Sequence, residues 1–133
     1  MDRNRHENGR DAPMRDVAVA EDWTEALERL IAQREHVSRS VARPIAARRA
    51  GVPAGTLYSL ARRRLKGVSN SVLRGIGGAL IRELQHELAR VEHDLQTHTQ
   101  IGGRPDDGAA IALVASRQKI LEALGIAGAG AGP

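Results

Sequence analysis

The pattern of residues around Gly51 constrains the fold of this chain more than any other feature of its sequence. Two short stretches with apolar residues at helical spacing meet at this glycine. A glycine there can supply a positive φ angle, and the small Ala47, four residues earlier, lets two helices cross closely. The other core positions are also apolar: Ala46, Ala50, Val52, Leu57 and Leu60. The segment therefore predicts two helices that are joined by a tight turn and locked at a steep angle.

This segment resembles the helix-turn-helix of tetracycline-repressor-type and phage-repressor-type regulators over about 21 residues, Arg43 to Arg63. In those regulators an Ala-Gly-Val turn, here residues 50–52, is followed by a recognition helix with Thr-Leu-Tyr, here residues 56–58. The chain departs from them at Pro53, where they commonly have a Ser or Thr cap, although Pro suits a first helical turn. The resemblance does not extend to any ligand-binding domain of those families.

The charge of the surrounding segment has one sign. From His36 to Arg82 the chain runs 47 residues without an Asp or Glu and carries ten Arg or Lys, although its net charge is only +4. Such a surface attracts phosphate backbones through counterion release. We therefore expect double-stranded DNA as a partner, with no membrane partner and no cofactor.

The resemblance implies that the second helix of the motif enters the major groove and reads base edges. By position, the base-reading residues would be Ala54, Gly55, Tyr58, Ser59 and Arg62. Arg62 suits guanine, and Tyr58 suits a thymine methyl group or a phosphate. Because residues 53–55 offer few hydrogen-bonding side chains, we expect modest sequence specificity. Alternatively, Tyr58 is a half-buried core residue, and Arg62, Arg63 and Arg64 contact phosphates without reading bases.

The other cations of the basic segment are expected to contact phosphates. They are Arg39, Arg43, Arg48, Arg49, Arg63, Arg64, Lys66 and Arg74. Helical spacing points these side chains to different sides, so they cannot all touch DNA at once.

The scarcity of aromatic residues favours an all-α fold. With no Phe, one Trp and one Tyr, a core must be built from Leu, Ile, Val and Ala, which suits packed helices. The absence of Cys excludes disulfides and thiol catalysis. The first 15 residues lack the apolar run of a signal peptide, and no stretch approaches the roughly 20 apolar residues of a membrane span. We expect a cytoplasmic, nucleoid-associated protein.

The N-terminal half divides into a flexible arm, residues 1–20, and a helical domain, residues 21–68. A capping box at Asp22 and Glu25 predicts a first helix that ends near His36. Its expected polar face is Glu25, Glu28, Arg29 and Arg34. The second helix is expected over about Ser40 to Ala50. Either the helix proper begins near Pro44, with about Arg43 as the simpler start, or it is kinked at Pro44. The third runs from Pro53 to about Arg64, with Gly67 available for a left-handed cap.

Residues 69–99 predict a long helix that is capped by Ser69, Asn70 or Ser71 and mediates oligomerisation. Its heptad seam, a possible short coiled coil, is Ile81, Leu84, Leu88, Val91 and Leu95. Glycines at 75, 77 and 78 weaken its start, or allow close approach of another helix or of a phosphate.

Residues 100–124 are expected to form a loop and a last helix, Gly108 to Leu124, which is capped by Asp106 or Asp107. Its expected buried face is Ile111, Val114, Ile120, Leu121 and Leu124, and residues 125–133 are a Gly/Ala tail.

These features favour a sequence-specific transcriptional regulator of bacterial or phage type that acts as a homodimer. A phage DNA-packaging subunit resembling a small terminase, an architectural or RNA-binding protein, and a protein-interaction module remain alternatives. The chain is not expected to be an enzyme, because its Ser, His and Asp residues form no nucleophile elbow. His86 and His93 lack the further ligands that a metal site needs.

Overall fold

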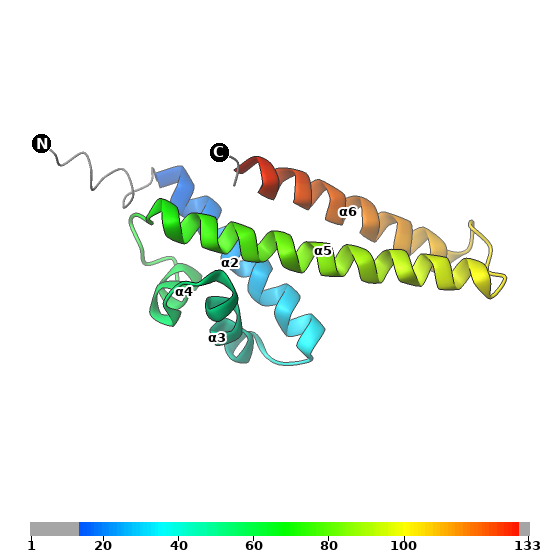
Figure 1. Cartoon of the computed structure of the whole chain (residues 1–133), viewed down its shortest axis with the longest axis horizontal. Helices are drawn as coiled ribbons and strands as arrows, with labels where there is room; N and C mark the ends of the chain where they lie inside the picture. Colours follow the sequence, from blue (N-terminus) through cyan, green and yellow to red (C-terminus); the bar gives the residue numbers. More distant parts are fainter. Residues whose placement is uncertain (1–13, 131–133) are drawn as a thin grey trace, which may run out of the picture. The chain divides into compact units, whose positions relative to one another are not determined.

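The computed structural model describes residues 14–130, and within this range the chain folds into helices alone. The five helices are α2 (Met14–Glu35), α3 (Arg39–Ala50), α4 (Ala54–Ala61), α5 (Asn70–Gln100) and α6 (Gly108–Gly130) (Figure 1). The expected all-α fold is confirmed, with a long helix, α5, of 31 residues and a C-terminal helix. Among the described residues, no helix combines the length and the apolar character that crossing a bilayer requires.

The chain divides into two compact units after Leu80, at a point inside α5. The N-terminal unit, as described here, comprises residues 14–80, and the C-terminal unit comprises residues 81–130. In the N-terminal unit α2, α3 and α4 contact one another. In the C-terminal unit α6 runs back beside the later part of α5 as a helical hairpin (Figure 1).

The first helix begins earlier than the sequence predicted. α2 starts at Met14, so the expected flexible arm is wrong for residues 14–20, while residues 1–13 lie outside the described range. Val17 and Ala20 are buried and extend the apolar face of Leu27 and Ile31 at helical spacing. The predicted capping box at Asp22 therefore lies inside the helix.

The second helix also starts before its predicted residue. Ser38 is the N-cap of α3, and its Oγ accepts a hydrogen bond from the backbone N–H of Val41 at 3.3 Å. The helix proper begins at Arg39 and not at Arg43, with Pro44 inside it. A proline in a helix interior removes one backbone hydrogen bond and costs about 3 kcal/mol. Burial of four alanines offsets this cost: Ala42, Ala46, Ala47 and Ala50.

The third helix, α4, ends at Ala61, three residues before its predicted end. The left-handed residue that follows it is Arg63, with φ 57°, and the predicted cap residue Gly67 does not have a positive φ. A residue with a Cβ in this conformation costs roughly 1 kcal/mol or more. The Arg63 guanidinium lies 2.8 Å from a carboxylate oxygen of Glu21 on α2, which ties this turn to the helix beside it.

The start of α5, which belongs to the N-terminal unit, packs closely against α2 and α3 through two glycines. A Cβ at Gly75 would collide with the backbone carbonyl oxygen of Ala50 at the end of α3. A Cβ at Gly77 would lie 2.7 Å from the indole ring of Trp23 on α2. Gly75 and Gly77 therefore allow the close approach of another helix, which is one of the roles predicted for them.

The predicted caps of the two long helices are confirmed. The Ser69 Oγ accepts a hydrogen bond from the N–H of Val72 at 3.1 Å, and an Asp107 oxygen accepts one from the N–H of Ala110 at 3.0 Å. However, α6 continues to Gly130, so the predicted tail is wrong for residues 125–130. The alanines there favour helix, and no proline interrupts the chain before Pro133.

The predicted buried face of α6 is correct only in part. Ile120 is buried and Leu124 is half-buried, whereas Ile111, Val114 and Leu121 are exposed and Ala110, which was not predicted, is buried. The sequence could not distinguish the two sides, because apolar residues surround most of this helix and no single stripe stands out.

Candidate nucleic-acid interface

The turn between α3 and α4 has the geometry that the sequence predicted. Gly51 adopts the left-handed conformation, with φ 69° and ψ 32°, and its N–H donates to the carbonyl of Arg48 at 3.2 Å. No atom lies within 4 Å of a Cβ placed at Gly51, so its φ angle and not a lack of space requires glycine. After the turn, Leu57 and Leu60 are both 0% exposed and anchor α4 to the core.

The opposite side of α4 faces solvent. Four of the five predicted base-reading residues are exposed, and Ser59 is half-buried; the exposed residues are Ala54, Gly55, Tyr58 and Arg62. Tyr58 is 40% exposed, so part of its side chain is open to a partner and part is covered by the chain. These positions recur at helical spacing, so they form one continuous face.

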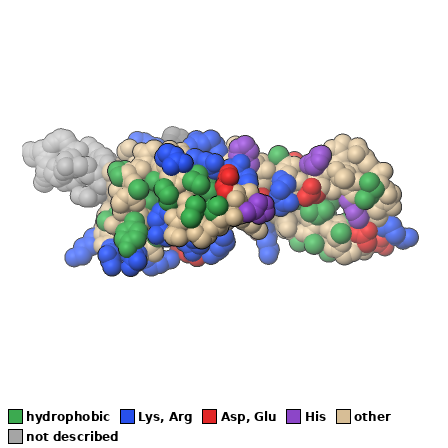
Figure 2. Space-filling model, turned by 90° about the horizontal axis from the view of Figure 1, so that it is seen from below, with side chains coloured by type: hydrophobic (Ala, Val, Ile, Leu, Met, Phe, Trp, Pro, Cys, Tyr) green, Lys and Arg blue, Asp and Glu red, His purple; other side chains and the backbone are tan. Residues whose placement is uncertain are grey.

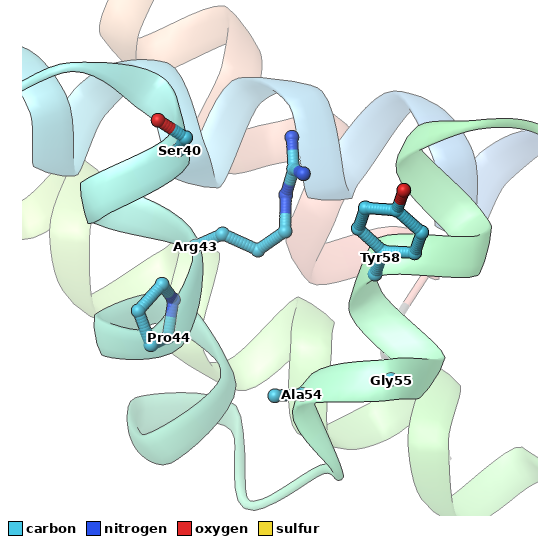
Figure 3. Close-up of a pocket in the computed structure, with 6 residues that line it drawn as sticks. All are labelled: Ser40, Arg43, Pro44, Ala54, Gly55 and Tyr58. Atoms are coloured by element: carbon cyan, nitrogen blue, oxygen red, sulfur yellow. The ribbon is translucent and has the colours of Figure 1, made fainter.

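Two guanidinium groups orient the ring of Tyr58. The guanidinium carbon of Arg62 lies 4.6 Å from the ring centroid, and that of Arg43 lies 5.6 Å from it. Cations within about 6 Å of an aromatic ring are attracted to its face. The ring therefore lies near both Arg43 of α3 and Arg62, the residue that follows α4. Figure 3 shows it beside the Arg43 side chain.

A buried carboxylate fixes Arg43 from behind. Glu28 on α2 is 0% exposed, contrary to its predicted place on a polar face. Arg43 donates from Nε to Glu28 Oε2 at 2.7 Å and from Nη2 to Oε1 at 3.2 Å, and Arg39 Nη2 donates to Oε1 at 3.0 Å. The hydrogen bond to Glu28 raises the pKa of the Arg43 guanidinium above its ordinary value. The single negative charge of Glu28 thus neutralises one of the two positive charges of Arg39 and Arg43.

The predicted phosphate-binding cations fall into two groups. The first group pairs with carboxylates of α2: Arg39 and Arg43 with Glu28, Arg49 with Glu35, and Arg63 with Glu21. Within residues 14–130, the second group makes no ion pair and is exposed: Arg48, Arg64, Lys66 and Arg74, together with Arg62. The acid-free segment alone does not reveal this division, because the paired carboxylates lie upstream of it, on α2.

A shallow groove lies between α3 and the start of α4. It is lined by Ser40, Arg43 and Pro44 from α3 and by Ala54, Gly55 and Tyr58 from α4 (Figure 3). Pro53, the N-cap of α4, makes no side-chain capping hydrogen bond. The face on the side of α3 and α4 shows hydrophobic side chains bordered by many Lys and Arg side chains (Figure 2).

The predicted oligomerisation seam is partly covered by the chain itself. Val91 is 0% exposed and Leu84 is 6% exposed. The remaining seam residues, Ile81, Leu88 and Leu95, are half-buried. Leu84 and Val91 are therefore covered by residues of the chain itself.

The chain matches no protein-family model, and comparison with curated proteins and with solved structures finds no match. Any functional argument therefore rests on the chain's own residues. In the part of the chain that the structure describes, no three His, Cys, Asp or Glu side chains form a group that could hold a metal ion.

Proposed function

We propose that this chain is a sequence-specific DNA-binding regulator of bacterial or phage type, in which α3, the turn and α4 form a helix-turn-helix. The observation that carries the proposal is the outward face of α4. It presents Ala54, Gly55, Tyr58 and Arg62 beside cations that have no carboxylate partner in the described chain. A duplex approaching this face meets positive charge together with the short, open start of a helix.

The side chains of this face suit two kinds of contact with DNA, one to bases and one to phosphates. Arg62 can donate to the O6 and N7 acceptors of guanine, the commonest base contact of arginine in a major groove. The unpaired cations Arg48, Arg64, Lys66 and Arg74 suit phosphates, which position the protein without reading sequence. Since Ala54 and Gly55 bring no polar side chain, few residues remain to discriminate bases, and moderate specificity follows.

A homodimer is part of the proposal, and the outer side of α6 is the surface that we assign to it. Ile111, Val114, Leu121 and Ile126 are exposed along this helix. Several exposed large apolar side chains on one helix are typical of surfaces that bind another protein. A twofold pair of chains would present two copies of α4 to half-sites about one helical turn apart.

Selection of bound duplexes from a random DNA pool tests the function. The wild-type protein should enrich an inverted-repeat motif, and a Tyr58→Ala/Arg62→Ala double variant should lose that enrichment. Lys119→Ala is the matched control, because it removes one exposed positive charge from the C-terminal unit. The mass of the protein in solution tests the dimer, which Leu121→Glu should convert to a monomer.

Binding without base preference is the alternative that the five unpaired cations favour, as in a DNA-packaging or architectural protein. Salt-sensitive retention of all duplexes without motif enrichment would support it over the regulator. A closed ring of many subunits would then point to packaging. A chain that retains no duplex at low salt would refute both readings.

A further inference from the structure

The groove between α3 and α4 is less polar than its basic surroundings suggest. The ligand that we infer for it rests on the proposed DNA-binding function. Only Arg43 among its six lining residues is charged. The ring of Pro44, the methyl group of Ala54, the backbone of Gly55 and the ring of Tyr58 make up most of its wall (Figure 3).

Two of the three polar side chains of the groove, Ser40 and Arg43, already have partners within the chain, and the third is Tyr58 with its hydroxyl. Arg43 directs Nε and Nη2 to the buried carboxylate of Glu28, so its aliphatic stem is the part left beside the groove. The hydroxyl of Ser40 lies 3.1 Å from the hydroxyl of Ser38, within hydrogen-bonding distance. A phosphate or a guanine edge would have to use the Tyr58 hydroxyl or the remaining N–H groups of Arg43 as donors, whereas an apolar group needs none.

Space for such a group exists over the start of α4. Nothing lies within 4 Å of a Cβ placed at Gly55, which is exposed at the groove's edge. The apolar group that a base pair presents in the major groove is the methyl at C5 of thymine, and 5-methylcytosine carries the same group. The unpaired cations of the same unit complement the charge of a duplex.

We propose that this groove binds the C5-methyl group of a pyrimidine in duplex DNA, with Pro44, Gly55 and Tyr58 as its main contacts. The Glu28–Arg43 ion pair keeps the groove apolar and holds the wall against which Tyr58 stacks. Tyr58 then acts through its ring, and Arg62 remains the residue that reads hydrogen-bonding edges.

The experiment compares duplexes that differ only by methyl groups. Equilibrium binding is measured for a duplex of alternating A·T pairs and for the same duplex with every thymine replaced by uracil. Loss of one buried methyl group corresponds to about a fourfold loss of affinity for each site. A G·C duplex with and without C5-methylated cytosine separates the two sources of the methyl group, and methylation should strengthen binding by a similar factor if both are accepted.

Gly55→Ala tests whether the groove itself reads the methyl group. The added Cβ enters the open space, while alanine favours the helix, so the fold should be retained. The ratio of thymine to uracil affinities should fall toward one. Gly108→Ala is the matched control, because its Cβ also meets no atom within 4 Å but lies in the C-terminal unit.

The outcomes distinguish failure of the methyl-binding groove from failure of the proposed DNA-binding function. Equal wild-type affinity for the thymine and uracil duplexes, with binding intact, overturns the methyl site and leaves DNA binding standing. Discrimination that survives in Gly55→Ala places the methyl contact elsewhere and also overturns it. Failure to bind any duplex overturns the proposed function itself.

Discussion

The two units of the molecule handle apolar and charged side chains in opposite ways. The N-terminal unit buries Leu27, Leu57 and Leu60 and also encloses a carboxylate, Glu28, which it satisfies with two arginines. The C-terminal unit buries Val91 and Ile120 but leaves Ile111 and Leu121 in solvent. The first unit pairs several of its arginines with carboxylates of α2, whereas the second leaves several large apolar side chains of α6 exposed.

The largest expected contrast lies between a buried and an exposed apolar residue. Leu57→Ala should lower the free energy of unfolding by about 3 kcal/mol, because it removes a fully buried side chain that anchors α4. Ile111→Ala should change it by less than about 0.5 kcal/mol, because Ile111 is 57% exposed. Urea unfolding followed by circular dichroism, at a dilution that keeps the chain monomeric, measures both. A comparable loss at Ile111 would show that α6 is covered, and would break the contrast.

A smaller contrast separates two glutamates. Glu28→Gln should cost about 2 kcal/mol, because it weakens hydrogen bonds from Arg39 and Arg43 to a buried carboxylate. Glu122→Gln, an exposed position on α6, should stay within about 0.5 kcal/mol. Amide hydrogen exchange should accelerate in α2 and α3 in the first variant alone. Equal effects of the two substitutions would contradict the role assigned to Glu28.

The smallest effect is a dependence of the C-terminal unit on acid pH. A hydrogen bond from the N–H of Ala110, followed by the proximity of His98, lowers the pKa of Asp107 below its ordinary value. The stabilisation from this carboxylate is therefore complete above its unfolded-state pKa, near 4, and is lost as the pH falls through the lower folded-state value. Amide exchange at the start of α6 should quicken over that acid range.

Asp107→Asn should flatten this response, since the amide oxygen still caps the helix but no longer titrates. The exposed Asp106→Asn provides the matched control and should leave the response intact. Because the Asp107 side chain is 38% exposed and therefore partly screened by water, the change should be smaller than those at Leu57 and Glu28. An unaltered pH response in Asp107→Asn would exclude this residue as its origin.

The features that the sequence predicted correctly depend on local signals. A glycine at position 51, the capping side chains of Ser69 and Asp107, and the apolar spacing that buries Leu57 and Leu60 all act within a few residues. Local rules therefore found the α3–α4 turn and the exposed face of α4.

The errors arose where distant residues decide the outcome. Glu28 counts as a polar surface residue until two arginines, 11 and 15 positions later, fold onto it. Those same arginines, Arg39 and Arg43, looked available for phosphates because their partner lies outside the acid-free segment. In α6, apolar residues on most sides left the buried face undetermined, since its choice depends on what lies beside the helix.

The packing of Trp23 on Gly77 gives the protein an internal optical reporter. Trp23 and Tyr58, the only Trp and Tyr of the chain, both belong to the N-terminal unit, and the sequence contains no Phe. Tryptophan emission therefore follows the contact of α2 with the start of α5, while residues 81–130 are silent in fluorescence and visible in far-ultraviolet dichroism. A single titration observed by both signals would reveal whether the two units unfold together or in sequence.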